Sequence, residues 1–239
     1  MNKWVRHLLQ LVSVLLFIAI LWWAEPKTWQ QLRQGNPTDL LCFFGIYAIA
    51  GIVSASRLRL ITHAITGKTW ASWRQYFHLN WTARALGLVL PRSVSGVGGK
   101  TVGLRTFGIS VKTSIWIVLV DNLFDLLLLT SVTLPSILFF QGSLSEQWLF
   151  AGMLLMLFLF AVAVWWGTKA DHLQLLLQRI PFFKKRLPDL HSGRLLPTGP
   201  QALQAAGFSL LLNGVLAVSF YVMGHAVGLS LPLPLIVAA

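Results

Sequence analysis

The stretch Asn80-Trp-Thr-Ala-Arg-Ala-Leu-Gly-Leu-Val-Leu-Pro91 decides the fold of this chain, and it runs directly into Arg92-Ser-Val-Ser-Gly-Val-Gly-Gly-Lys100. Polar side chains precede the apolar part, Pro91 ends it, and glycines and cations follow. The next long apolar segment, Val111 to Phe140, carries two aspartates. Broken apolar backbone followed by acids inside an apolar helix predicts a polar cavity at membrane depth.

The composition indicates an integral membrane protein. Of 239 residues, 56% are hydrophobic and 11% are charged, whereas a soluble domain carries about 25% charged residues. One crossing needs about 20 apolar residues, so the length predicts roughly five to seven spans and no separate soluble domain. We expect a single integral membrane domain over residues 1–239, incomplete at its C-terminus because the last residues resemble the start of another helix.

The charge distribution restricts the partners. The net charge is +12, from 19 Lys and Arg against 7 Asp and Glu, which is typical of cytoplasmic loops that meet anionic lipid. The sequence has no recognisable nucleic-acid-binding module, so nucleic acid is not expected as a partner. Cys42 is the single cysteine of the sequence, which excludes an internal disulfide and a cysteine-rich metal site.

Apolar runs predict five spans, and the second is expected to end where Arg57 and Arg59 begin a basic loop. A short interfacial helix is expected from Leu60 to Gly67. Basic residues before the first run place the N-terminus in the cytoplasm. The expected spans are Leu8–Trp23, Leu40–Ser56, Val111–Phe140, Trp148–Gly167 and Ala202–Val227.

The basic segments predict a re-entrant element. The segments 57–76, 92–112 and 168–200 are all basic, and all should therefore be cytoplasmic. A helix that crossed completely before Pro91 would place two of them on the wrong side. Both conflicts disappear if a pair of half-helices at about 77–110 enters and leaves the membrane on one side, so the expected fold is an all-α polytopic membrane protein with this re-entrant pair.

Candidate site residues fall into two groups. Flexible backbone at Gly98 and Gly99 could turn N–H groups toward an anion, and Arg92, Lys100 and Arg105 suit phosphate by charge and donor geometry. The spacing departs from a nucleotide-binding loop, because Val94 stands where its first glycine should be. Alternatively, the glycines permit only a tight turn and the cations only set topology. The candidate head-group-binding residues are Asn80, Arg92, Gly98, Gly99, Lys100 and Arg105.

Asp121 and Asp125 are four residues apart and share one helix face. An acid at the centre of a spanning helix costs about 2.5–3.5 kcal/mol, so these two require partners or a function. They could pair structurally with Arg84, Arg92 or Arg105, or they could carry protons or bind a cationic head group. No histidine spacing suits a metal, and no spacing supports a catalytic triad, so we expect no cofactor and no catalytic residue.

Several short motifs resemble the family of lysylphosphatidylglycerol synthase transmembrane regions, also described as flippase-like membrane proteins. The resemblance rests on Arg57-Leu-Arg59, Asn80, Leu90-Pro91, Gly98-Gly99, Gly108-Ile-Ser110 and Val118-Leu-Val-Asp121-Asn-Leu-Phe-Asp125-Leu. It implies a polytopic protein of the bacterial inner membrane with a re-entrant element, which handles aminoacylated phosphatidylglycerol or glycolipid and hopanoid precursors. Two positions depart from the family pattern: Asn122 replaces a frequent arginine, and Lys100 replaces a residue that is often acidic or polar.

The expected function is binding and translocation, or assistance in translocation, of a phosphate-bearing lipid or of an aminoacyl- or glycolipid head group. The expected partners are anionic or aminoacylated phospholipids, polyprenyl- or hopanoid-linked lipids, and synthase enzymes. The sequence has nothing that could supply the aminoacyl-transferase domain of the family's synthases, so enzymatic activity is not expected. The alternatives are a membrane-embedded glycosyl- or head-group transferase component and a non-transporting partner in envelope lipid biosynthesis.

Overall fold

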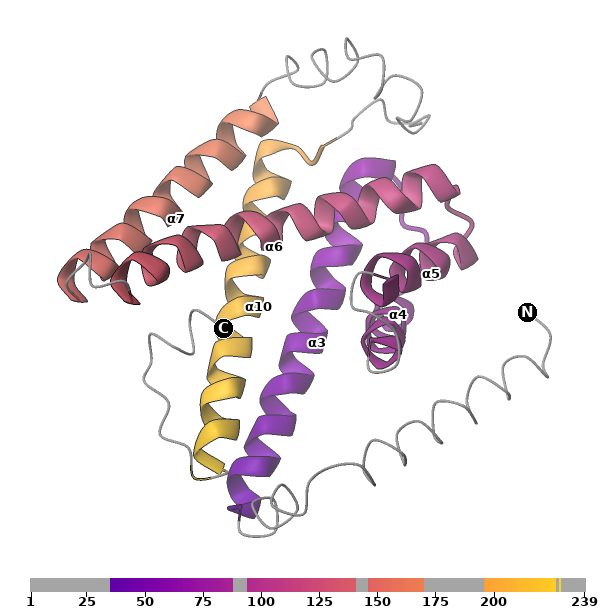
Figure 1. Cartoon of the computed structure of the whole chain (residues 1–239). Helices are drawn as coiled ribbons and strands as arrows, with labels where there is room; N and C mark the ends of the chain where they lie inside the picture. The colour runs from indigo at the N-terminus through magenta and orange to yellow at the C-terminus, as the bar shows by residue number, and fades with distance from the viewer. Residues whose placement is uncertain (1–34, 88–93, 141–145, 170–195, 227, 229–239) are drawn as a thin grey trace.

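A computed structural model describes residues 35–87, 94–140, 146–169, 196–226 and 228, and every regular element in these ranges is a helix (Figure 1). The helices in chain order are α3 (Pro37–Thr66), α4 (Trp73–Leu86), η1 (Val94–Gly99), α5 (Lys100–Thr106), α6 (Val111–Phe140), α7 (Glu146–Lys169) and α10 (Gly199–Ala226). The expected span Leu8–Trp23 lies outside the described residues. The predicted all-α membrane fold is confirmed.

Helix α3 is longer than the sequence suggested. Asn36 caps its start by accepting a hydrogen bond from Thr38 N at 3.0 Å, and Gly67 ends it in a left-handed conformation at φ 68°. The expectation that this span closes at Ser56 is wrong, because no helix-breaking residue stands between Ser56 and Gly67. Arg57 and the segment that was expected to be a separate interfacial helix are therefore continuous with the span.

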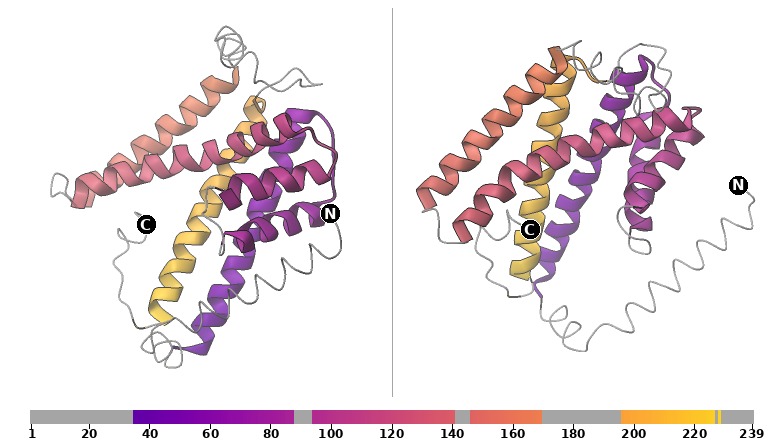
Figure 2. Two further views of the ribbon diagram at one scale, coloured as in Figure 1. Left: turned by 45° about the vertical axis from the view of Figure 1, so that its right-hand side comes forward. Right: turned by 45° about the horizontal axis from the view of Figure 1, so that its top comes forward.

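Helices α3 and α10 lie side by side in opposite directions (Figures 1 and 2). His225 near the end of α10 lies 3.2 Å from Asp39 in the first turn of α3. Further along the pair, Leu212 of α10 packs with Ala50 and Val53 of α3. Because the residue numbers fall on one helix as they rise on the other, the two helices form an antiparallel pair.

Helix α4 and the η1–α5 segment form an antiparallel helical hairpin, seen as two short helices beside α3 in Figure 2. The rings of Tyr76 and Phe107 meet at its base with centroids 5.4 Å apart. Nearer the tip, a Cβ built on Gly99 would lie 3.3 Å from the Cβ of Ala83. Glycine therefore allows the two arms to approach closely.

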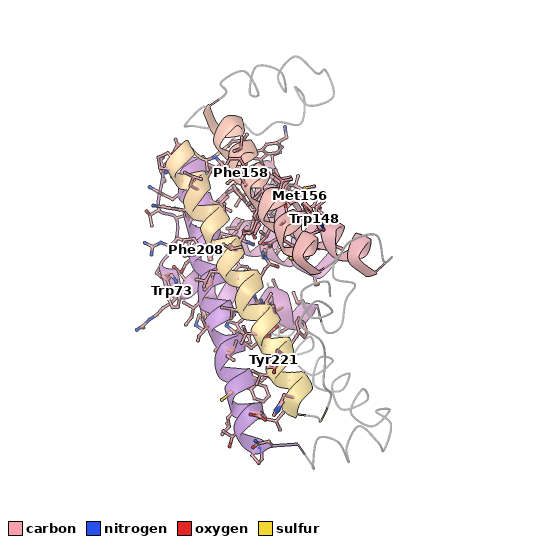
Figure 3. All side chains as sticks on the ribbon, turned by 90° about the vertical axis from the view of Figure 1, so that its left-hand side faces the viewer. Trp73, Trp148, Met156, Phe158, Phe208 and Tyr221 are labelled. Carbon is pink, nitrogen blue, oxygen red and sulfur yellow. The ribbon has the colours of Figure 1, made fainter. Side chains whose placement is uncertain are left out.

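Helix α6 crosses α3 and α10 obliquely, and α7 packs against α6 and α10 (Figures 1 and 2). In the described part of the chain, three helical stretches are long and apolar enough to cross a membrane: Pro37–Thr66, Val111–Ser131 and Gly199–Ala226. Trp148 and Phe158 of α7 are exposed (Figure 3), as expected for side chains that face lipid.

Candidate functional site

Arg57 lies inside the helix bundle and donates hydrogen bonds to two other helices. Its side chain is 1% exposed. Nε donates to Asp121 Oδ1 at 2.8 Å, Nη2 donates to Asp125 Oδ2 at 2.7 Å, and Nη1 donates to both Asp125 Oδ1 and Ser209 Oγ. The planar guanidinium fork thus binds Asp125 through two parallel hydrogen bonds and joins α3 to α6 and α10.

Asp121 is shared between two cations. Its carboxylate is fully buried, and its second oxygen accepts a hydrogen bond from Lys100 Nζ at 2.6 Å. Lys100 is the first residue of α5, so this contact ties the hairpin to α6. We call Arg57, Lys100, Asp121 and Asp125 the ionic cluster. Two cations and two carboxylates balance, and so the ionic cluster is formally neutral within apolar helices.

The polar residues that meet here lie at similar distances along their helices from one helix end. Arg57, Asp121 and Ser209 each lie nine or ten residues from the end of their helix, at Thr66, Val111 and Gly199 respectively. At 1.5 Å per residue, each lies about 15 Å from that end. The three helices therefore bring their polar groups together well inside the bundle, away from these helix ends.

Neutral hydrogen bonds hold the hairpin beside the ionic cluster. Asn80 of α4 accepts a hydrogen bond from Ser54 Oγ at 3.2 Å and donates from Nδ2 to the carbonyl of Tyr76 at 3.2 Å. Trp73 Nε1 donates to Ser56 Oγ at 3.1 Å. Ser54 and Ser56 lie within the one turn of α3 that precedes Arg57, so the hairpin docks on the same part of α3 as the ionic cluster.

The structure brings together three of the residues singled out from the sequence and places the others around them. Lys100, Asp121 and Asp125 meet in the ionic cluster, and Asn80 lies one helical turn of α3 away. The remaining predicted residues are dispersed: Gly99 packs on Ala83, Gly98 has no atom within 4 Å of a built Cβ, Arg105 is exposed on α5, and Arg92 lies outside the described residues.

Arg57 is a site residue that the sequence pattern did not indicate. Arg57 was assigned to a loop that sets topology, and the suggested partners of the acids were Arg84, Arg92 and Arg105. Neither Arg84 nor Arg105 pairs with an acid in the described ranges. A usable signal was present, because two acids within an apolar helix need cations, and Arg57 lies within an uninterrupted helical sequence.

Within the described ranges, His, Cys, Asp and Glu side chains form no group of three that could hold a metal ion. The two acids of the ionic cluster are instead bound to cations. Each carboxylate contacts Arg57, and Asp121 also contacts Lys100.

The model of the family described as lysylphosphatidylglycerol synthase TM region matches residues 10–239. The chain belongs to this family. No curated protein and no solved structure shows significant similarity to the chain. Membership in the lysylphosphatidylglycerol synthase TM-region family places the chain among multi-pass membrane proteins of lipid biosynthesis or translocation. The ionic cluster and its docked hairpin are the polar centre of this family member in the described part of the chain.

Proposed function

We propose that this protein translocates, or helps to translocate, a phosphate-bearing lipid or an aminoacyl- or glycolipid head group across the bacterial inner membrane. The contact between Lys100 and Asp121 carries the proposal. It joins the hairpin to α6, and Asp121 is fully buried within the apolar helices.

The sharing of Asp121 makes this contact exchangeable. If an anionic head group takes over Lys100, Asp121 keeps its hydrogen bond with Arg57 at 2.8 Å and is not left as an isolated buried charge. An isolated buried charge would be strongly destabilising. The head group would replace one carboxylate contact of Lys100 with another anionic contact, while the hairpin is released from α6.

The dimensions of the hairpin support its re-entry on one side. Helix α4 has 14 residues, so it is about 21 Å long, less than the roughly 30 Å of a hydrocarbon core. The contacts of α4 with α3 run from Trp73–Ser56 near the base to Trp81–Tyr47 toward the tip. Tyr47 still lies about 15 Å from the start of α3 at Pro37. The hairpin therefore accompanies α3 for only part of its length.

The basic ends of the helices support an orientation. The hairpin base joins the end of α3 to the start of α6, and this side carries Arg59, Lys68, Arg74 and Lys112. An excess of Lys and Arg marks the cytoplasmic side. We therefore assign this side to the cytoplasm, from which a head group would reach Lys100, and the same assignment places the N-terminus in the cytoplasm if one span precedes α3.

The proposed role involves no chemical step on the lipid. The three acids whose side chains the structure describes are each held by a cation or a histidine: Asp121 and Asp125 by Arg57, and Asp39 by His225. A transferase would need an acid free to bind a metal or activate a hydroxyl group. Among the acids that the structure describes, this engagement favours translocation over transfer.

The test is the movement of labelled lipids across proteoliposomes that contain the purified chain. We expect movement of a phosphate-bearing lipid with the native chain and reduced movement with Lys100→Ala and with Asp121→Asn. Lys112→Ala is the matched control, because it removes the same charge from an exposed position at the start of α6. Equal rates in all four proteins would remove the ionic cluster from the mechanism, and no movement with the native chain would refute translocation by this chain alone.

A further inference from the structure

Arg84, near the end of α4, is a cation without a carboxylate partner in the described part of the chain. Its guanidinium carbon lies 5.2 Å from the ring centroid of Tyr47 on α3. Its Nη1 atom is buried and has no hydrogen-bond partner. The described acids pair elsewhere, since Asp121 and Asp125 belong to the ionic cluster and Asp39 contacts His225.

The contrast with the ionic cluster defines what Arg84 can attract. The ionic cluster is neutral, whereas Arg84 keeps its full positive charge and a buried donor without a partner. Leaving such a donor unsatisfied is costly, and charge-assisted bonds to phosphate or carboxylate are the strongest way to satisfy it. An unpaired cation at membrane depth indicates a binding site, because such residues are expensive to keep there.

The aromatic side chains around Arg84 fix its position. Tyr47 lies under the guanidinium, and the ring of Trp81 meets Tyr47 edge to face with centroids 5.7 Å apart. Trp81 is itself seated where Gly51 leaves room for its indole, since a Cβ on Gly51 would lie 2.8 Å from Trp81 Nε1. Stacking on a braced ring restricts the guanidinium plane and so aligns its remaining donors before a ligand arrives.

We infer that Arg84 binds the phosphate of the lipid head group and forms a second binding site, beyond the ionic cluster. That the phosphate belongs to a lipid rests on the proposed function. That Arg84 binds phosphate follows from the chemistry of the arginine itself. Tyr47 lies ten residues from Arg57 along α3, so the Arg84 site is about 15 Å farther than the ionic cluster from the end of α3 that we assign to the cytoplasm. The fork of an arginine matches two phosphate oxygens, which a lysine cannot match in the same way.

Binding to the purified protein in detergent tests the inference without requiring translocation. The probes are dihexanoyl phosphatidylglycerol, inorganic phosphate, and dihexanoylglycerol, which lacks the phosphate. The rise in unfolding temperature with probe concentration gives each dissociation constant. The variants are Arg84→Gln and Arg84→Lys, and the matched control is Arg74→Gln, which removes one charge from an exposed position of the same helix.

We expect phosphatidylglycerol to bind the native chain and Arg74→Gln equally, and to bind Arg84→Gln at least about tenfold more weakly for each charge-assisted hydrogen bond lost. Arg84→Lys should recover only part of this loss. Protection by phosphatidylglycerol but not by inorganic phosphate identifies the lipid as the source of the phosphate, and equal protection by both identifies the free anion.

Two results would overturn the inference. Equal binding of the phosphate probes to the native chain and to Arg84→Gln would show that Arg84 only fastens the hairpin to Tyr47, and a lower unfolding temperature without any probe would accompany that result. Equal protection by dihexanoylglycerol would show that the acyl chains alone bind. Either result leaves a measured lipid movement in proteoliposomes intact, so the inference and the proposed function can fail separately.

Discussion

Replacing Asp121 with asparagine removes the carboxylate that the two cations share. Arg57 keeps its two hydrogen bonds with Asp125, but Lys100 loses its anionic partner and remains largely buried, with 14% of its side chain exposed. The single replacement Lys100→Met is milder, because Asp121 then still contacts Arg57. The double variant Lys100→Met, Asp121→Asn contains neither a buried lysine without an anionic partner nor the acid that bound it.

The structure sets the expected sizes of these effects. Breaking a buried ion pair by removing one partner costs about 3–5 kcal/mol, which we expect for Asp121→Asn. Loss of one hydrogen bond to a charged group costs about 1.5–3 kcal/mol, which we expect for Lys100→Met. Because the two residues share one contact, their effects should not add. We expect the double variant to lose at least about 1 kcal/mol less free energy of unfolding than the two single variants lose in total.

The assay is thermal unfolding of the purified chain in detergent. For a chain of this size, about 1 kcal/mol shifts the unfolding temperature by roughly 2–4 °C, so Asp121→Asn should lower it by roughly 6–20 °C. The exposed Lys112→Met serves as the control and should stay within about 0.5 kcal/mol of the native chain. Additive effects of Asp121→Asn and Lys100→Met would refute the shared contact on which the proposed exchange depends.

Two further predictions concern packing and topology. Gly51→Ala should destabilise the chain by about 1–3 kcal/mol in thermal unfolding, because its Cβ would lie 2.8 Å from the rigid indole of Trp81. Gly45→Ala in the same helix is the control, since nothing lies within 4 Å of its Cβ, and an equal effect of both would contradict the docking of α4 on α3. Cysteines placed at Lys68 and at Lys112 in a cysteine-free background should react with an impermeant reagent from the same side, because the proposed re-entrant hairpin would return the chain to its starting side. Labelling from opposite sides would contradict re-entry.

The long apolar helices were predictable because each is a continuous apolar run bounded by polar, glycine or proline residues. The segment Val111–Phe140 was predicted with the bounds that α6 has in the structure. The end of α3 was misplaced because two arginines were interpreted as a loop signal. Charge marks the membrane boundary only when the side chains reach water, and Arg57 instead finds two carboxylates and a serine within the bundle.

The acids were predictable as site residues, but their partners were not. The four-residue spacing of Asp121 and Asp125 places them on one face from sequence alone, and their high cost in an apolar helix signals that they matter. Which cations reach them depends on how α3 and the hairpin dock against α6. Arg57 is separated from Asp121 by 64 residues, and no local pattern encodes a contact at that distance in sequence.

The placement of Lys100 and Arg84 is consistent with different roles for these two cations of the hairpin. Lys100, at the start of α5, is neutralised by an acid of a spanning helix, so it can hold the hairpin closed without attracting an anion at long range. Arg84, on α4, has no such acid among the described residues and keeps the charge that attracts one. If both cations were unpaired, the bundle would bear two buried charges at a prohibitive cost. If both were paired, no net charge would draw a phosphate inward. Arg74 and Arg105 of the same hairpin are exposed, so a paired Lys100 beside an unpaired Arg84 is the arrangement of its less exposed cations that satisfies both requirements.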